Sequence, residues 1–188
     1  LDVINFAFAH VNPQHEVFLP RETATRSLAA LTALRKDNPD LKIMLSVGGW
    51  GAGNFSEAAA SEAARAPFAD TAVELVRRHD LDGVDIDWEY PGHPGPGISY
   101  SADDKANFPL MLDAVRAKLD ALGKTQGHRR YLLTIAAARL FALGEAETQG
   151  ALTLHRKTRF LEAITMAGGL TTYADKGNVT LLRYDEGK

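Results

Sequence analysis

The 188-residue chain contains no cysteine and only two tryptophans, Trp50 and Trp88. The lack of cysteine excludes disulfides and thiolate-bound metals, but it does not identify a compartment. The chain has no run of Lys or Arg and a net charge of only −3, so no nucleic-acid partner is predicted. No apolar stretch has transmembrane length, and no basic segment followed by an apolar one marks a signal peptide.

The apolar residues that are present are enough for a core. Hydrophobic residues make up 45% of the chain, and the length suits one ordinary domain or two small ones. The chain opens directly on the apolar segment Leu1–Val11, which we interpret as a strand buried on both faces. Because the chain starts inside a strand, we expect that an N-terminal portion is missing.

Strands alternate with helices over the first 138 residues, which predicts right-handed βαβ units and a parallel sheet. A doubly wound sheet and a (β/α)₈ barrel both fit this order. We prefer the barrel because polar groups follow successive strands where barrel active sites lie, and no Gly-x-Gly-x-x-Gly motif occurs there. The further predicted strands are Leu41–Val47, Gly83–Trp88 and Tyr131–Ala137, and the helices are Thr23–Lys36, Ser61–His79 and Ala102–Leu122.

The segment Leu81–Pro91 alternates apolar residues with acids, which predicts a strand with one apolar and one acidic face. Residues on one face of a strand are about 6.6–7 Å apart, so three carboxyls share a small volume. The apolar face carries Val84, Ile86 and Trp88, and the opposite face carries Asp85, Asp87 and Glu89.

Three carboxylates this close repel one another, so we expect at least one to keep its proton near neutral pH, with coupled titrations. A protonated carboxyl beside an ionised one is what glycoside cleavage requires. The alternatives are a solvated acidic surface or a hard-cation site. Gly83 before the acids and Tyr90-Pro91 after them are unusual for a solvated face, and calcium loops place acids in glycine-containing turns. We expect no metal and no cofactor.

The acidic segment resembles the catalytic strand of family 18 glycoside hydrolases, the chitinase-like enzymes, whose pattern is Asp-x-x-Asp-x-Asp-x-Glu. Asp82, Asp85, Asp87 and Glu89 fill its four positions. The resemblance extends over residues 1–138. Three other segments resemble the family's second, third and fifth barrel strands, in that order: Ile4–Ala9, Ser46–Trp50 and Leu133–Ala136. The implied fold is α/β, a partial TIM (β/α)₈ barrel with strands two to five of eight.

The resemblance implies a retaining mechanism in which the substrate's own N-acetyl oxygen is the nucleophile. Glu89 is then the general acid and later the base, and Asp87 bonds the acetamido N–H and offsets the charge of the intermediate. Asp85 shares a proton with Asp87, and Ser46 completes the hydrogen-bond chain.

Three aromatic residues are further candidates for the substrate site. Phe8 and Trp50 are expected to line the sugar site, although a core role suits each equally well. Tyr90 is a weaker candidate, because Tyr90-Pro91 also suits a role in fixing the exit of the strand.

The implied function is hydrolysis of chitin-type β-1,4-N-acetylglucosamine polymers or chito-oligosaccharides by a secreted or periplasmic parent protein. The family's sixth-strand Met-x-Tyr-Asp motif has no match, and the late tryptophan of the sugar site is absent. We therefore expect weak or absent turnover, and self-association through open barrel edges. The alternative is a non-catalytic carbohydrate-binding or polysaccharide-export-associated interaction module.

The pattern changes after Ala138, and we divide the chain into residues 1–138 and 139–188. Residues 139–185 resemble the β-grasp ligand-binding repeat of bacterial polysaccharide export proteins, which implies a small α+β module. An unrelated αβ extension, or a barrel that diverged after its fifth strand, remains open. The matching segments are Phe141–Glu145, Phe160–Ile164, Ala167–Thr171 and Asn178–Arg183.

Overall fold

The computed structural model describes residues 1–95, 98–136, 140–142 and 150–152. Internal contacts divide the chain into two units, Leu1–Ile135 and Ala136–Lys188, and each is described by itself.

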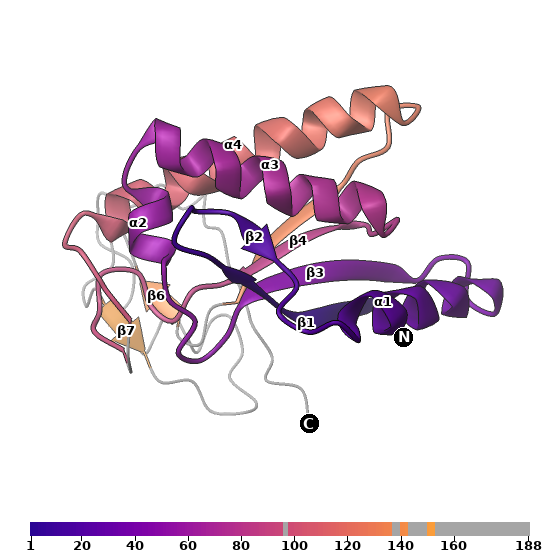
Figure 1. Ribbon diagram of the computed structural model, residues 1–188, viewed down its shortest axis with the longest axis horizontal. Coiled ribbons are helices and arrows are strands. Elements are labelled where there is room, and N and C mark those ends of the chain that lie inside the picture. The colour runs from indigo at the N-terminus through magenta and orange to yellow at the C-terminus, as the bar shows by residue number, and fades with distance from the viewer. Residues whose placement is uncertain (96–97, 137–139, 143–149, 153–188) are drawn as a thin grey trace, which may run out of the picture. The chain divides into compact units, whose positions relative to one another are not determined.

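A sheet with the strand order β2-β1-β3-β4-β5 is the centre of the first unit (Figure 1). Strands β1, β3, β4 and β5 are parallel neighbours, which confirms the predicted pairing. Strand β2 pairs antiparallel with the end of β1, and this pairing was not predicted. The strands are β1 (Val3–Val11), β2 (Val17–Phe18), β3 (Lys42–Gly48), β4 (Gly83–Asp87) and β5 (Leu132–Ile135).

The three predicted helices are present, and the longest two, α3 and α4, lie side by side against the sheet (Figure 1). The hydroxyl of Ser61 caps α3 by accepting the N–H of Ala64 at 3.2 Å. The short α2 was not predicted. The helices are α1 (Ala24–Ala33), followed by a 3₁₀ turn (Leu34–Lys36), α2 (Phe55–Ala59), α3 (Glu62–Arg78) and α4 (Asp104–Thr125). No helix in the described ranges is both long and apolar enough to cross a membrane.

The core lies between the sheet and its helices. Trp88, just beyond β4, is its central aromatic residue: it stacks on Phe55 of α2 with ring centroids 5.5 Å apart and meets Phe108 of α4 edge-on at 5.4 Å. Val84 and Ile86 are fully buried on the same face. The predicted apolar face of the acidic strand is therefore confirmed.

The prediction that the first strand is buried on both faces is wrong. Ala9 and Val11 are buried, but Val3, Asn5 and Ala7 are exposed. The reason is that burial of an apolar strand depends on what covers it, and no described element covers this face of β1.

The second unit contains a two-stranded antiparallel sheet of β6 (Leu140–Ala142) and β7 (Gly150–Leu152). The sequence also predicts two short strands joined by a turn here, over Leu140–Leu143 and Ala151–Leu154, and the pairing of β6 with β7 confirms them. Apolar spacing also predicts a short helix over Arg159–Ala167, and β-prone residues predict a strand over Asn178–Arg183; both lie outside the described residues.

Candidate functional site

The acidic end of β4 lies between the carboxyl ends of β3 and β5, since all three strands are parallel. Strand β4 ends at Asp87, so Glu89 lies two residues past its end rather than within it. Ser46, Asp85 and Thr134 occupy one row across the three strands. The sheet thus gathers side chains from distant segments at one edge.

Asp85 is almost fully buried, with 4% of its surface exposed, and each of its carboxyl oxygens has a hydroxyl partner. The Ser46 hydroxyl donates to Oδ2 at 2.8 Å, and the Thr134 hydroxyl donates to Oδ1 at 2.6 Å. The contact with Ser46 was predicted, whereas Thr134 was missed because threonine is an ordinary residue in a strand. Only the register of β5 against β4 indicates its role.

Asp87 is half-buried and has an altered acidity. Burial, followed by the negative charges of Glu89 and Asp85, raises the pKa of Asp87 from 3.8 to about 6. Asp87 therefore keeps its proton into the weakly acidic range, as expected for acids that share one face of a strand.

Glu89 is half-buried and follows the anchored Trp88, which fixes the backbone from which its side chain extends. Within the described part of the chain, no Arg, Lys or His forms an ion pair with Asp85, Asp87 or Glu89. Of the three acids, Asp85 has hydroxyl partners and Asp87 has a raised pKa.

The two glycines after Ser46 allow the backbone to approach Asp87. Gly48 has φ +127°, and a Cβ there would lie 2.0 Å from the carbonyl oxygen of Asp87. The N–H of Gly49 donates to the same carbonyl at 3.0 Å, and a Cβ on Gly49 would lie 2.8 Å from the Phe8 ring. The Ser-x-Gly-Gly motif therefore connects the acidic strand to Phe8 through a contact that larger residues would block.

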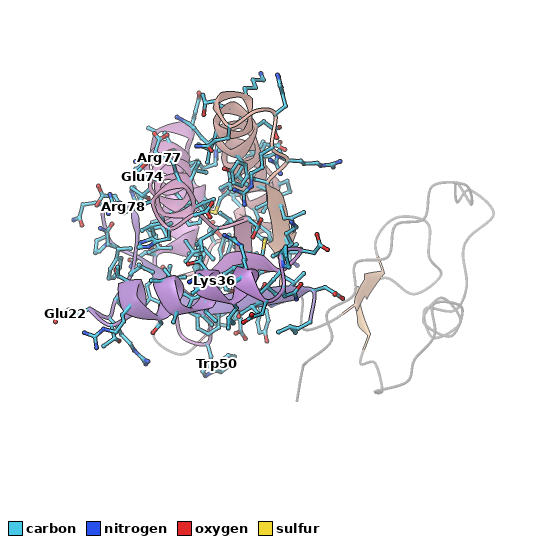
Figure 2. All side chains as sticks on the ribbon, turned by 90° about the vertical axis from the view of Figure 1, so that its right-hand side faces the viewer. Glu22, Lys36, Trp50, Glu74, Arg77 and Arg78 are labelled. Atoms are coloured by element: carbon cyan, nitrogen blue, oxygen red, sulfur yellow. The ribbon has the colours of Figure 1, made fainter. Side chains whose placement is uncertain are left out.

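The aromatic candidates differ in exposure. Trp50 is 70% exposed and projects from the surface on the side away from Arg77 and Arg78 (Figure 2), which excludes a core role. Phe8 is 37% exposed and lies where β1 departs from regular register with β3. It borders a hollow of about 350 Å³ that His10 and Arg21 also line. Tyr90 is half-buried.

A buried carboxyl missed by the sequence analysis, Asp104, supports the loop that follows Glu89. It is fully buried at the start of α4, and its Oδ1 accepts the Ser56 hydroxyl at 2.6 Å. Its Oδ2 accepts the backbone N–H groups of Gly92 at 3.1 Å and Ser101 at 2.8 Å. Asp104 therefore fixes both ends of this loop to α2 and α4.

Asp82, the first acid of the four-residue pattern, lies at the opposite end of β4 from the other three. Its carboxylate accepts Arg35 at 2.6 Å, Arg129 at 2.7 Å and the N–H of Ile43 at 2.8 Å. Burial opposes the ionisation of Asp82, but these hydrogen bonds outweigh it and hold its pKa below the ordinary value. Its contacts indicate a role in holding the fold.

The sequence model described as glycosyl hydrolases family 18 matches residues 1–147 of the chain. The chain belongs to this family.

Its relatives are longer proteins. The chain is 49% identical to Chitinase A1 of Niallia circulans over 109 residues. This alignment covers 57% of the chain and 16% of that protein. The solved family 18 N-acetylglucosaminidase from Paenibacillus barengoltzii is 50% identical, with a TM-score of 0.67 over 73% of this chain and 39% of that one. The chitinase-like agglutinin of Robinia pseudoacacia is 29% identical, with a TM-score of 0.61 over 71% of this chain and 39% of that one. The family 18 chain therefore spans well under half the length of these relatives.

Proposed function

We propose that the family 18 chain carries the acid–base part of a site that hydrolyses chitin-type β-1,4-N-acetylglucosamine polymers. The observation that carries this proposal is the environment of Asp87, whose pKa is raised to about 6 between buried Asp85 and Glu89. An acid that exchanges its proton near neutral pH beside other carboxyls suits glycoside cleavage.

In the proposed reaction, Glu89 protonates the glycosidic oxygen as the bond from that oxygen to C1 breaks. The acetamido oxygen of the same sugar forms the new bond to C1. Ionised Asp87 accepts the acetamido N–H and offsets the positive charge of the ring that forms, while its proton is shared with Asp85. Glu89 then takes a proton from water, whose oxygen bonds to C1 as the bond from the acetamido oxygen to C1 breaks, which restores the acetamido group.

Substrate contacts are proposed for the groups around these acids. Exposed Trp50 offers a flat apolar surface for a sugar ring, and Phe8 lies against Gly49 beside the acidic strand. Tyr90 is proposed to contribute from the position next to Glu89. The parent protein is proposed to be secreted or periplasmic, where such polymers occur.

We propose weak or absent turnover for the chain by itself. The sequence has no match for the family's sixth-strand tyrosine motif or its late tryptophan, and each lost transition-state contact costs on the order of 10²–10³ in rate. The second candidate function is therefore non-catalytic carbohydrate binding, or interaction within a polysaccharide-export assembly. The agglutinin relative supports the former, and the resemblance of residues 139–185 to a β-grasp repeat supports the latter.

The test is release of chromophore from a chromogenic chitobioside by the chain, by Glu89→Gln and by Glu74→Gln. Glu74 is a surface residue on α3 paired with Arg77 and Arg78, so its variant is the matched control. We expect slow turnover that Glu89→Gln abolishes and Glu74→Gln preserves. Equal turnover in all three proteins would overturn the assignment of Glu89 as the acid. Chitin binding that persists in Glu89→Gln without any turnover in the parent chain would favour the carbohydrate-binding module.

A further inference from the structure

A hollow of about 470 Å³ lies where the C-terminal end of α4 meets the turn that leads into β5 (Figure 1). Basic side chains line most of it: Arg116, Lys124, His128, Arg129 and Arg130. Arg129 binds Asp82 just before β4 begins, whereas Asp85 and Asp87 lie toward the end of that strand. The basic hollow and the acidic site are therefore at opposite ends of the sheet.

The turn between α4 and β5 is folded closely against the helix. A Cβ on Gly123 would lie 2.3 Å from the carbonyl oxygen of Arg129, so only glycine allows this approach. Gly127 and His128 both have a left-handed backbone, with φ +66° and +64°, which turns the chain back toward α4. The helix end and the turn thus carry their side chains around one concave surface.

Two of the lining arginines are held in place by the fold. Arg116 donates from Nη1 to the carbonyl of Tyr131 at 2.9 Å, and its Nη2 lies 2.7 Å from Oδ1 of Asp120, which also lines the hollow. Arg129 binds the buried carboxylate of Asp82 at 2.7 Å. Carboxylates therefore compensate the charges of both arginines, which form a fixed wall of the hollow.

The other basic side chains, Lys124, His128 and Arg130, are exposed and have no carboxylate partner in the described part of the chain. They do not bond the end of α4 either, since the carbonyl of Gly123 accepts the N–H of Gln126 at 3.1 Å. The lysine and this arginine thus leave uncompensated positive charge at a concave surface, which attracts anions.

We propose that this hollow binds an acidic polysaccharide, a chain of sugars that carry carboxylates. Lys124 and Arg130 bind the carboxylate of one sugar unit, and the ring N–H of His128 donates to the same unit. The long stems of the lysine and arginine side chains offer apolar surface to the C–H face of the sugar ring. Binding here does not depend on the proposed hydrolase activity, because the acids at the other end of the sheet take no part in it.

The size and extent of the hollow favour a sugar acid over other anions. Its volume is typical of sites that enclose a small ligand or one part of a longer one. The uncompensated basic groups are confined to one helix end and one turn, whereas a nucleic acid requires a longer basic stripe. The net charge of the whole chain, −3, also opposes general attraction of a polyanion.

The test is a ¹H–¹⁵N NMR titration of the whole chain with trigalacturonate at low salt. We expect the amide signals of residues 123–130 to shift, and the same signals to stay unchanged with neutral chitotriose. Lys124→Gln and Arg130→Gln should each weaken binding by about threefold to tenfold. Lys118→Gln is the matched control, because Lys118 is also on α4 but pairs with Asp70 and does not line the hollow. Its affinity should equal that of the parent chain.

The control separates a specific site from general attraction. Equal weakening by Lys118→Gln and Lys124→Gln would overturn the proposal, as would tighter binding of a single-stranded oligonucleotide than of trigalacturonate. Shifts caused by inorganic sulfate but not by trigalacturonate would also overturn it. The fluorescence of buried Trp88 reports that each variant is folded. Since the titration needs no turnover, binding by an inactive chain would remove the hydrolase proposal and retain this one, and turnover without binding would do the reverse.

Discussion

Ser56 donates its hydroxyl to Asp104 at 2.6 Å, and this bond joins α2 to the first turn of α4. Asp104 also accepts the N–H groups of Gly92 and Ser101, so one buried carboxyl holds the loop that follows the candidate acid. Side chains of α2 and α4 therefore hold this loop at both of its ends.

Replacing Asp104 by Asn should loosen this loop, because the Asn amide presents N–H donors where the backbone N–H groups need an acceptor. We expect a loss of about 1–3 kcal/mol in the free energy of unfolding. Urea denaturation followed by tryptophan fluorescence measures this loss, and amide exchange at Gly92 and Ser101 should become faster. The exposed neighbour Asp103 provides the control Asp103→Asn. Equal stability of the two variants would contradict the role of Asp104.

Removal of the Asp82 carboxylate should destabilise the fold without changing the acidic site directly. Asp82→Asn leaves Arg35 and Arg129 without their buried partner, and we expect a loss on the order of 3 kcal/mol. Asp80→Asn is the control, because Asp80 contacts the same two arginines but is largely exposed, and it should cost under about 1 kcal/mol.

The destabilisation by Asp82→Asn should also depend on pH. Because the native pKa of Asp82 is lowered, its contribution is present above the pKa of the unfolded chain and is lost as the pH falls through the native value. Urea denaturation at pH 7 and at successively lower pH should therefore show the two proteins converging in stability. A difference that stays constant over this range would contradict the ionic role of Asp82.

Asp87 should have the opposite pH dependence. Its native pKa of about 6 exceeds the ordinary 3.8, so the native state favours the protonated form, and the parent chain loses stability as the pH rises through this window. Asp87→Asn resembles the protonated form at every pH. We expect it to gain about 1–2 kcal/mol over the parent chain between pH 4 and pH 8, after allowance for partial exposure. The exposed Asp113→Asn is the control in the same denaturation series, and the same pH trend in both variants would contradict the raised pKa.

Self-association should occur through the uncovered face and edge of the sheet. Strand β5 ends the described sheet, and its Leu132 is 37% exposed, while Val3 of β1 is 46% exposed. Sedimentation velocity should reveal dimers or larger species, and Leu132→Lys should reduce them. Leu110→Lys is the control, since Leu110 is 47% exposed and lies on the helix α4 rather than on a strand. A monodisperse monomer in the parent chain would contradict this prediction.

The sequence predicted those parts of the fold in which a repeated local pattern matches the structure. The two-residue period of Val84, Ile86 and Trp88 predicted which face of β4 is buried, and helical spacing predicted α1, α3 and α4. The five-residue α2 is too short to show a period, and it follows Asn54 in a left-handed conformation. Pairing of β2 with β1 depends on contacts that no short pattern contains.

The sequence predicted the candidate site only where its residues belong to a recognisable motif. Ser46 and the three acids of the β4 segment stand in distinctive motifs, so the sequence indicated them. Thr134 and Asp104 have ordinary local contexts, and only register and tertiary contacts reveal what they hold. Asp82 belongs to the motif by spacing, but its partners Arg35 and Arg129 come from distant segments, and no local pattern indicates them.

The shared row of Ser46, Asp85 and Thr134 also constrains how the sheet assembles during folding. A slip of β4 by one residue would turn Asp85 toward the helices and move Val84 and Ile86 to the opposite face of the sheet. The misaligned sheet would bury an unpartnered carboxylate against the helices and remove two large apolar residues from the core, so it would be unstable as well as inert. Correct strand alignment and the arrangement of the acids are thus selected by the same three side chains.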